Sequence, residues 1–260
     1  MTSAGATVGR FIEDLAWPEV AAAFKADVPV LVPVGAIAKE HGHHLPLKND
    51  WLLARALAEG VAARLPVLIA PIIPFGYYPV FRAYPGSQHL SADTFVAVVT
   101  ELLENYLDQG AQRLAILNTG VSTEGPIGLA TRGLLERRGI RIGVADIRRL
   151  GRGADHLLQQ KFGSHADERE TSIMLAVAPE LVRMELARPD YGKEGATGIF
   201  LTPTTMQSAD PNAADYSQTG AYGDPTLASA EKGRQFLAAM IEDLVGGLIV
   251  MFPDLGPSAR

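Results

Sequence analysis

Short apolar runs alternate along this chain with longer segments of helical pattern, and this alternation restricts the fold more than any other feature. The apolar runs cover residues 28–34, 67–73, 113–117 and 140–147. Strands buried on both faces of a parallel sheet read as continuous runs of this kind. Helices are expected over residues 11–24 with an interruption at Pro18, 51–65, 92–108 after a Ser91 cap, a segment ending at 138, 168–178 and 227–248. The pattern predicts an α/β fold with a mainly parallel sheet.

Composition limits the class of protein. A chain of 260 residues with 47% hydrophobic and 20% charged residues is expected to form a single α/β domain over residues 1–260. The absence of cysteine excludes disulfides, thiolate metal sites and a cysteine nucleophile, and it fits a reducing cytoplasm. No apolar run approaches the roughly 20 residues of a membrane span, so no membrane partner is expected.

Charge gives no sign of a nucleic-acid partner. The net charge is −6, and lysine and arginine are scattered along the chain, so there is no basic stripe. One small cluster, Arg148, Arg149 and Arg152, is interpreted as a solvated or subunit-contact patch.

A histidine-rich segment follows the first apolar run directly. Residues 34–50 hold three of the six histidines, His41, His43 and His44, together with Glu40 and Asp50. In open α/β sheets the chemistry lies at the carboxyl ends of the strands. Histidine and carboxylate without thiolate are typical ligands of a hydrolytic Zn, Mn or Fe site. An ordinary solvated loop is the alternative.

Four segments, in order, resemble the creatininase (creatinine amidohydrolase) family. The first is Pro33-Val34-Gly35 with Glu40-His41-Gly42, His44-Leu45-Pro46-Leu47 and Asp50. The others are Tyr84-Pro85-Gly86-Ser87, the stretch from Ser164 to Ser172 with Pro179-Glu180-Leu181-Val182, and Gly223-Asp224-Pro225 with Glu231-Lys232-Gly233.

The resemblance implies a three-layer α/β/α fold and a divalent-metal site, usually binuclear, that activates water against a small substrate. It also implies a homohexamer. The aromatic loop over residues 75–84 and the polar stretch over residues 191–224 fit a homo-oligomer larger than a dimer, because long loops of this kind serve sites or subunit contacts.

Two departures from the family pattern alter the expected metal site. A ligating glutamate usually stands two residues before the histidine of the first motif, and Lys39 occupies that position here. The family's Asn-Gly-His reads Asn118-Thr119-Gly120, so a second ligand is missing. We therefore expect one tight divalent ion (Mn, Zn or Fe) per chain.

Six residues are assigned metal-binding or catalytic roles. Metal ligands are expected among Glu40, His41, Asp50 and Glu170, and catalytic roles are expected for His165, as a proton shuttle, and for Lys39.

Simpler roles stay open for several of them. Asp50 suits the N-cap of the following helix, Glu40 a loop surface, and Glu170 a helix-capping position. His43 is interpreted as exposed or substrate-facing, and His44 as a hydrogen-bonded structural residue.

Three functions remain possible at this level. The first is metal-dependent hydrolysis of a small cyclic or N-acyl substrate, such as a cyclic amide, lactam or lactone. The second is metal-dependent C–C hydrolysis or isomerisation of a cyclic ketone or polyol derivative, where the Lys39 cation could stabilise an enolate. The third is a non-catalytic protein that retains the fold.

Overall fold

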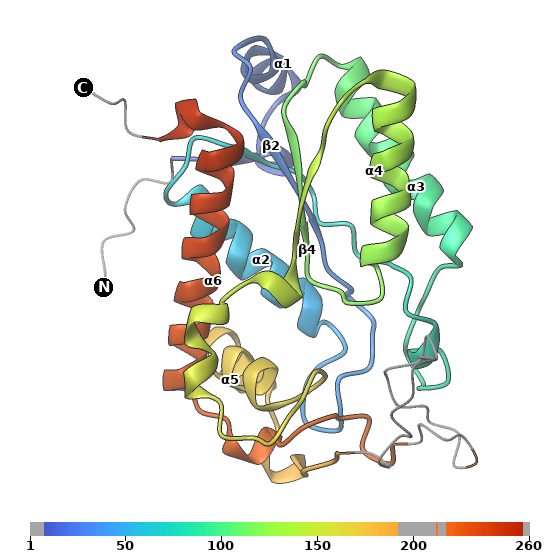
Figure 1. The fold of residues 1–260 in the computed structure, drawn as a ribbon, viewed down its shortest axis with the longest axis vertical. Helices are drawn as coiled ribbons and strands as arrows, with labels where there is room; N and C mark the ends of the chain where they lie inside the picture. Colours follow the sequence, from blue (N-terminus) through green and yellow to red (C-terminus); the bar gives the residue numbers. More distant parts are fainter. Residues whose placement is uncertain (1–7, 192–211, 213–216, 257–260) are drawn as a thin grey trace, which may run out of the picture.

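The computed structural model describes residues 8–191, 212 and 217–256, and a five-stranded parallel sheet lies at its centre (Figure 1). Its order is β1-β3-β2-β4-β5. The strands are β1 Arg10–Phe11, β2 Val30–Val34, β3 Leu68–Ile69, β4 Leu114–Asn118 and β5 Gly143–Asp146. All of β2 and β4 is buried, as expected for strands covered on both faces. The prediction of a mainly parallel sheet is confirmed.

Helices cover both faces of the sheet. They are α1 Trp17–Lys25, α2 Asn49–Ala62, α3 Ala92–Asp108, α4 Glu124–Arg138, α5 Glu168–Val177 and α6 Ala230–Met251. Short 3-10 turns span Ile12–Asp14, Pro79–Phe81, Ile147–Arg149, Arg152–Leu157, Pro179–Leu181, Met184–Leu186, Pro225–Leu227 and Pro253–Leu255.

Side chains of β2 alternate between two cores, which establishes the layers. Leu31 packs with α2, α5 and α6, whereas Val30 and Val32 pack with α1, α3 and α4. Figure 1 shows α6, α2 and α5 on one side of the sheet and α3 and α4 on the other. The three-layer α/β/α architecture is confirmed.

The start of the chain differs from its predicted structure. Phe11, expected to begin a helix, pairs with Ile69 in the edge strand β1, and the helix begins at Trp17. Pro18 lies in its first turn, where the missing N–H has no helical partner to lose. Proline therefore starts this helix rather than interrupting it.

Two strands are shorter than predicted. Residues 67–73 form a regular strand only at Leu68–Ile69, and Ile73 keeps an isolated bridge to Val34. Pro71 and Pro74 supply no N–H for a ladder, which accounts for the shortening. The run over residues 140–147 is regular only at Gly143–Asp146.

Several predicted helices are confirmed with their caps. α3 has the predicted bounds, and the Ser91 hydroxyl accepts a hydrogen bond from the Thr94 amide (3.3 Å). α5 begins after Asp167, whose carboxylate accepts from the Glu170 amide (3.0 Å). These short side chains satisfy amides that a helix leaves unpaired.

Helices α5 and α6 approach each other closely at Gly233. A Cβ atom at this position would overlap the backbone carbonyl of Ser172 in α5. The Ser172 hydroxyl also accepts a hydrogen bond from the Ser229 amide, at the α6 N-cap (3.1 Å). Glycine thus fixes the distance between the two helices.

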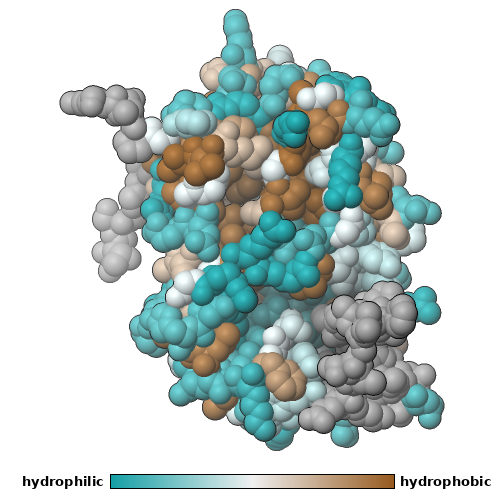
Figure 2. All heavy atoms as spheres, in the orientation of Figure 1, coloured by the Kyte–Doolittle hydropathy of each residue, from teal (hydrophilic) through white to brown (hydrophobic). Residues whose placement is uncertain are grey.

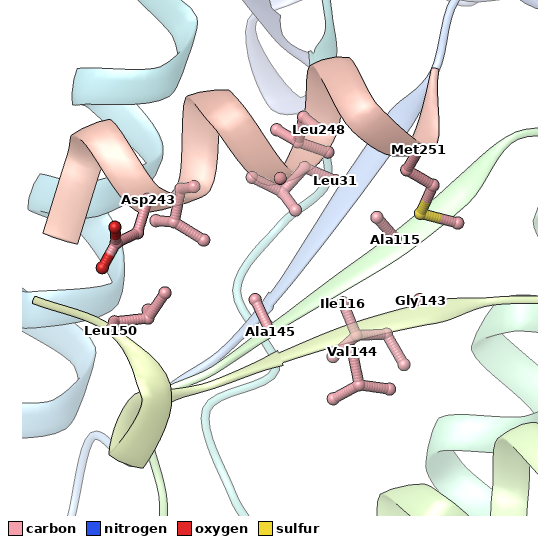
Figure 3. A pocket seen from close by; sticks show the side chains of 12 residues that line it. Leu31, Ala115, Ile116, Gly143, Val144, Ala145, Leu150, Asp243, Leu248 and Met251 are labelled. Carbon is pink, nitrogen blue, oxygen red and sulfur yellow. The ribbon is translucent and has the colours of Figure 1, made fainter. Parts of the chain in front are cut away.

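An apolar cavity of about 290 Å³ lies where α6 crosses the sheet edge at β5 (Figure 3). Leu248 and Met251 of α6 face Ala115 of β4 and Ala145 of β5 across it, and Asp243 lies at one end. Apolar side chains gather in the same part of the surface, between α6 and α4 (Figure 2).

None of the helices in the described part of the chain combines the length and the apolar character that a membrane span requires.

Candidate metal centre

The candidate site lies where β2 and β4 end side by side. Val34 and Asn118 are register partners at these ends, and the chain order of the sheet reverses here, since β3 adds on one side of β2 and β4 on the other. Such a switch point is where open α/β sheets bind ligands. The Thr119 hydroxyl donates to the carbonyls of Val34 (2.9 Å) and Asp50 (3.1 Å). It thereby holds the first turn of α2 against the strand ends.

Lys39, His41 and Asp50 form a buried charged group. The Lys39 ammonium lies 2.6 Å from Asp50 Oδ2, and His41 Nε2 lies 2.8 Å from Asp50 Oδ1. The side chains of Lys39 and Asp50 are 7% and 2% exposed. Each ion therefore depends on its partner, because an unpaired charge at such burial is very unfavourable.

The two ring nitrogens of His41 both face acceptors. Nδ1 lies 2.9 Å from the Lys39 carbonyl oxygen and Nε2 faces the Asp50 carboxylate. Burial acts to lower the pKa of His41, but Asp50 outweighs it and the pKa is raised. Burial likewise acts against the Asp50 carboxylate, yet Lys39 and then His41 hold the pKa of Asp50 far below its usual range. Neither ring nitrogen of His41 is free in this arrangement, so a metal ion at Nε2 would have to replace the hydrogen bond to Asp50.

Glu40 turns away from this group and holds His165. Its Oε2 accepts from His165 Nε2 (3.0 Å), and its other oxygen accepts from the Gly42 amide. The Glu40 amide donates to the Ser87 hydroxyl (3.0 Å). A histidine that gives one N–H to a carboxylate keeps its other nitrogen free to bind a metal. That nitrogen, Nδ1, lies 4.0 Å from Glu170 Oε2.

His41, His165 and Glu170 together could hold one metal ion. Each offers one ligand atom, and the three atoms lie within 4.8 Å of one another. Two histidines and one glutamate are a known ligand set for a catalytic divalent ion with an open coordination position. The Glu170 carboxylate accepts from the Ala166 amide (2.7 Å), so its helix-capping role and a ligand role coexist.

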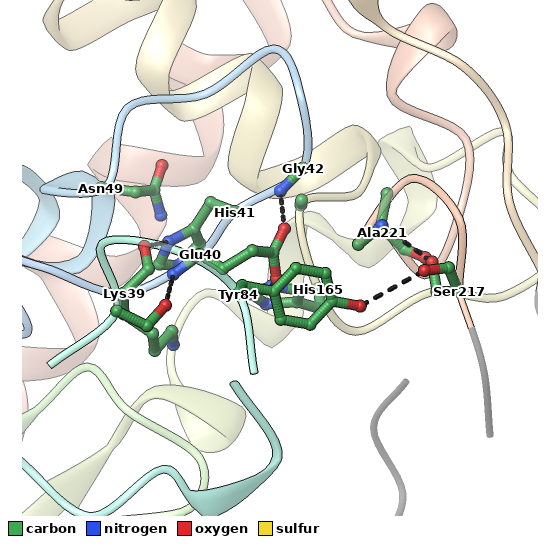
Figure 4. Close-up of polar contacts among 12 residues, drawn as sticks. Lys39, Glu40, His41, Gly42, Asn49, Tyr84, His165, Ser217 and Ala221 are labelled. Carbon is green, nitrogen blue, oxygen red and sulfur yellow. Dashed lines mark hydrogen bonds and ion pairs between the residues drawn. The ribbon is translucent and has the colours of Figure 1, made fainter. Parts of the chain in front are cut away.

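Aromatic rings close the site on one side. The Phe81 ring lies 4.5 Å from the His165 ring between centroids, and the Lys39 ammonium lies 5.2 Å from the Phe81 centroid. The rings of His41 and His165 are 4.8 Å apart. Figure 4 shows Lys39, Glu40, His41 and His165 gathered beneath the loop that carries Tyr84. Phe81 belongs to the aromatic loop over residues 75–84, and its ring lies against His165 and Lys39.

The remaining residues of the histidine-rich segment have simpler surroundings. Asp50 is not a helix cap: α2 begins at Asn49, Lys48 is its N-cap, and the Asp50 carboxylate faces Lys39 and His41. His43 is exposed, as expected. His44 Nε2 lies 2.8 Å from the Thr171 hydroxyl. Burial, and then the nearby His41, lowers the pKa of His44 to about 4, which fits the predicted structural histidine.

Gly220 is a functional position that sequence reasoning did not single out. Its φ is +76°, and a Cβ there would overlap the Glu40 carboxylate. The neighbouring Tyr222 bridges to His165 through backbone hydrogen bonds. Gly220 and Tyr222, in the polar stretch over residues 191–224, thus lie beside the site. Residues 192–211 and 213–216 lie outside the described part of the chain.

Asp167 is another residue beside the site that the sequence did not identify. Burial, and then Glu170, raises the pKa of Asp167 to about 6. Gln160 donates to its Oδ2 (2.8 Å). The acidic start of a helix was the signal that could have identified it, but that signal also fits an ordinary N-cap.

At the end of β4, the position of the missing histidine is packed by a local network. Gly120 accepts hydrogen bonds at its carbonyl oxygen from Asn118 Nδ2 (2.7 Å) and the Thr123 hydroxyl (2.7 Å). A Cβ at Gly120 would lie 2.7 Å from the Thr123 hydroxyl. Any side chain there requires Thr123 to move, so this chain is built around glycine at the position.

Comparisons with known proteins identify the family of this chain. The creatininase family model, described as creatinine amidohydrolase, matches residues 13–248. A mycofactocin precursor peptide peptidase of Mycobacterium tuberculosis (strain H37Rv) is 32% identical over 231 residues, which cover 83% of this chain and 82% of that protein.

A 3-dehydro-scyllo-inosose hydrolase of Thermotoga maritima is 24% identical over 272 residues, covering 94% of this chain and 85% of the relative. The solved structure described as "Creatininase Mn" is similar over 94% of this chain and 99% of its own, with 25% identity and a TM-score of 0.79.

Proposed function

This chain belongs to the creatininase family and is a metal-dependent hydrolase of the amidohydrolase type, and we propose that it cleaves the C–N bond of a small cyclic or N-acyl substrate. The observation that supports this most strongly is the convergence of His41, His165 and Glu170 beside the buried Lys39–Asp50 pair. Cyclic amides, lactams and linear N-acyl compounds share the carbonyl that such a site attacks.

The residues present fit one divalent ion. His41, His165 and Glu170 would hold it, and the carbonyl of Lys39 and the carboxylate of Glu40 fix the two imidazole rings by binding their other nitrogens. Mn²⁺ or Zn²⁺ suits this nitrogen and oxygen set. When bound, the ion would polarise the substrate carbonyl and lower the pKa of a bound water.

Lys39 takes the place of a second ion in this proposal. Its ammonium neutralises Asp50 from inside the protein at 2.6 Å, where a dinuclear site would use Asp50 as a metal ligand. The cation also offers a fixed positive charge near the reacting carbonyl, which favours negative charge that develops in the transition state. We therefore expect one ion per chain.

Asp50 is a positioning residue here rather than a ligand. Its two oxygens pair with Lys39 and His41 in the structure. The pair with Lys39 would remain when an ion at His41 Nε2 replaces the other hydrogen bond. Glu40 positions His165 through its Oε2. Of the earlier ligand assignments the proposal retains His41 and Glu170, and it replaces the proton-shuttle role of His165 with metal binding.

A second candidate is hydrolysis of a cyclic ketone or polyol derivative. Its support is the buried Lys39 ammonium, which could stabilise an enolate, and the similarity to the Thermotoga maritima hydrolase. Release of an amine separates the two candidates, because only C–N cleavage produces one.

We also propose that the protein acts on a small molecule and assembles as a homohexamer. Light scattering tests the assembly.

Elemental analysis of protein purified without chelator tests the metal assignment. We expect about one Mn or Zn per chain, loss of the ion in His41→Ala and in His165→Ala, and unchanged content in His43→Ala. His43 is the matched control because it lies exposed in the same loop. Amine release from N-formyl and N-acetyl amino acids, lactams and short peptides then tests the reaction.

The variants also separate the two roles of His165. If His165→Ala keeps its ion but loses turnover by roughly 10²–10⁴-fold, His165 is a proton shuttle and not a ligand. Metal content near two per chain in the natural protein contradicts the role given to Lys39.

A further inference from the structure

A cavity of about 440 Å³ reaches, at Glu170, the cluster of candidate metal ligands formed by His41, His165 and Glu170. The cluster is otherwise closed: His41 and His165 are 0% and 2% exposed, whereas the Glu170 side chain is 20% exposed and lines the cavity. A volume of this size is typical of sites for small ligands. If the hydrolase function proposed above holds, a substrate that reaches Glu170 must place its non-reacting part in this cavity.

The cavity changes in character from its inner end to its mouth. Asp167 and Glu170 line the end at the cluster, and apolar side chains, including Ile173 and Met240, line the wall. Arg148 and Arg152 also line it, and their side chains are 52% and 65% exposed, so they stand at the mouth. A ligand that fits must therefore be apolar in the middle and complementary to cations at its outer end.

The arginines that line the cavity differ in how many of their nitrogens are already paired with other residues. Arg169 is held by Asp155, by the Gly151 carbonyl (3.4 Å) and by stacking over the Phe236 ring, and it is 17% exposed. Arg152 shares the same carboxylate, through its Nε alone (3.1 Å). Two cations thus share one anion.

Among the described residues, none accepts a hydrogen bond from the terminal nitrogens of Arg152. Arg148, by contrast, is paired to both Asp146 and Glu124. Arg152 is therefore the better anchor, and Arg148 lies beside it.

We propose that this cavity binds a carboxylate-terminated substrate, with Arg152 as the residue that recognises the carboxylate. A guanidinium presents donors in a planar fork that matches both oxygens of a carboxylate. The substrate class is then an N-acyl amino acid or the carboxyl-terminal part of a short peptide: its amide lies at Glu170, its apolar side chain against Ile173 and Met240, and its carboxylate at Arg152.

The local charge distribution supports an anion here although the chain is acidic as a whole. The net charge of −6 opposes anionic ligands in general, so binding requires a local cationic anchor. Arg148, Arg149 and Arg152 lie within five residues of the sequence, but only Arg148 and Arg152 line this cavity. Arg149 lines a different one, beside α4, and so provides a matched control.

The test measures binding of N-acetyl-leucine and N-acetyl-leucinamide to the metal-loaded protein by calorimetry. These probes differ in the carboxylate alone. We expect the acid to bind the natural protein about 10–100-fold more tightly than the amide, the range that a charge-assisted hydrogen-bond pair provides. Arg152→Gln should reduce this preference to about threefold or less and leave amide binding unchanged, while Arg149→Gln should change neither.

Three results would overturn the proposal. One is equal affinity of the natural protein for the two probes, including no measurable binding of either. Another is an equal effect of Arg149→Gln and Arg152→Gln. The third is acid binding that survives Arg152→Gln but disappears in His41→Ala, because the carboxylate would then be bound to the metal ion.

Turnover is measured separately, as amine release from the same probes. An Arg152-dependent preference without turnover supports the cavity proposal and contradicts the hydrolase proposal. Turnover of acid and amide at equal kcat/KM supports the hydrolase proposal and contradicts this one.

Discussion

Replacing Lys39 by glutamate most directly tests the proposal that the Lys39 ammonium takes the place of a second metal ion beside Asp50. The Lys39–Asp50 ion pair is almost completely buried, at 7% and 2% side-chain exposure, with 2.6 Å between Nζ and Oδ2. Loss of one partner from such a pair costs about 3–5 kcal/mol, because the remaining charge is left uncompensated. Lys39→Glu also sets a second carboxylate beside Asp50. For a chain of this size, a loss in that range lowers the Tm by about 5–10 °C.

Thermal unfolding followed by circular dichroism gives the measurement, first with EDTA and then with excess Mn²⁺. With EDTA we expect the drop just described. With Mn²⁺ we expect the Tm of Lys39→Glu to rise by more than the Tm of the natural protein does. We also expect about two ions per chain in the variant, against about one in the natural protein, because two carboxylates favour a divalent ion. Lys25→Glu is the control: Lys25 is exposed in the last turn of α1, so its cost should stay below about 1 kcal/mol.

Two results would refute this reasoning. An unchanged Tm in EDTA would mean that Asp50 does not depend on Lys39. An unchanged metal content in Lys39→Glu, together with the expected loss of stability, would mean that the ammonium stabilises the fold without standing where a second ion binds.

Two further changes have calculable outcomes. Because the pKa of His44 is about 4 in the folded protein and about 6.5 when unfolded, unfolding takes up a proton between these values, and stability falls as the pH drops from 6.5 to 4, by up to about 3 kcal/mol. His44→Gln should flatten this part of the pH profile in urea unfolding; an unchanged profile would show that His44 is not held neutral. Gly220→Ala should lower turnover about tenfold or more by displacing Glu40. Gly110→Ala, also at positive φ but with open space around a Cβ, should leave turnover unchanged; equal losses in both variants would exclude displacement of Glu40 as the cause.

The fold could be predicted in outline because its main signals are local. β2 and β4 are continuous apolar runs, and α3 carries a serine cap at its predicted start. The two-residue strand β1 could not be predicted, since only its pairing with Leu68 and Ile69 makes it a strand. Short edge strands have no periodicity of their own, so tertiary contacts decide them.

The candidate site was predictable only in part, for a related reason. His41 follows an apolar run in the sequence, and that position indicates chemistry. His165 lies 125 residues from Glu40, its hydrogen-bond partner, and spacing alone gives no sign of such a contact. The resemblance supplied His165 and Glu170 as site residues. It could not supply the direction of the Glu40 carboxylate, because hydrogen bonds from His165 and the Gly42 amide hold it.

The close crossing at Gly233 has a consequence for redesign of this protein. A methyl group there would push α5 away from α6, and Glu170 stands two residues before the contacted Ser172. Displacements of about 1 Å can reduce a catalytic rate about 100-fold. A library that varies α6 to improve solubility would thus lose activity at a position that bears no reactive group, and an alanine scan would misidentify Gly233 as part of the chemistry.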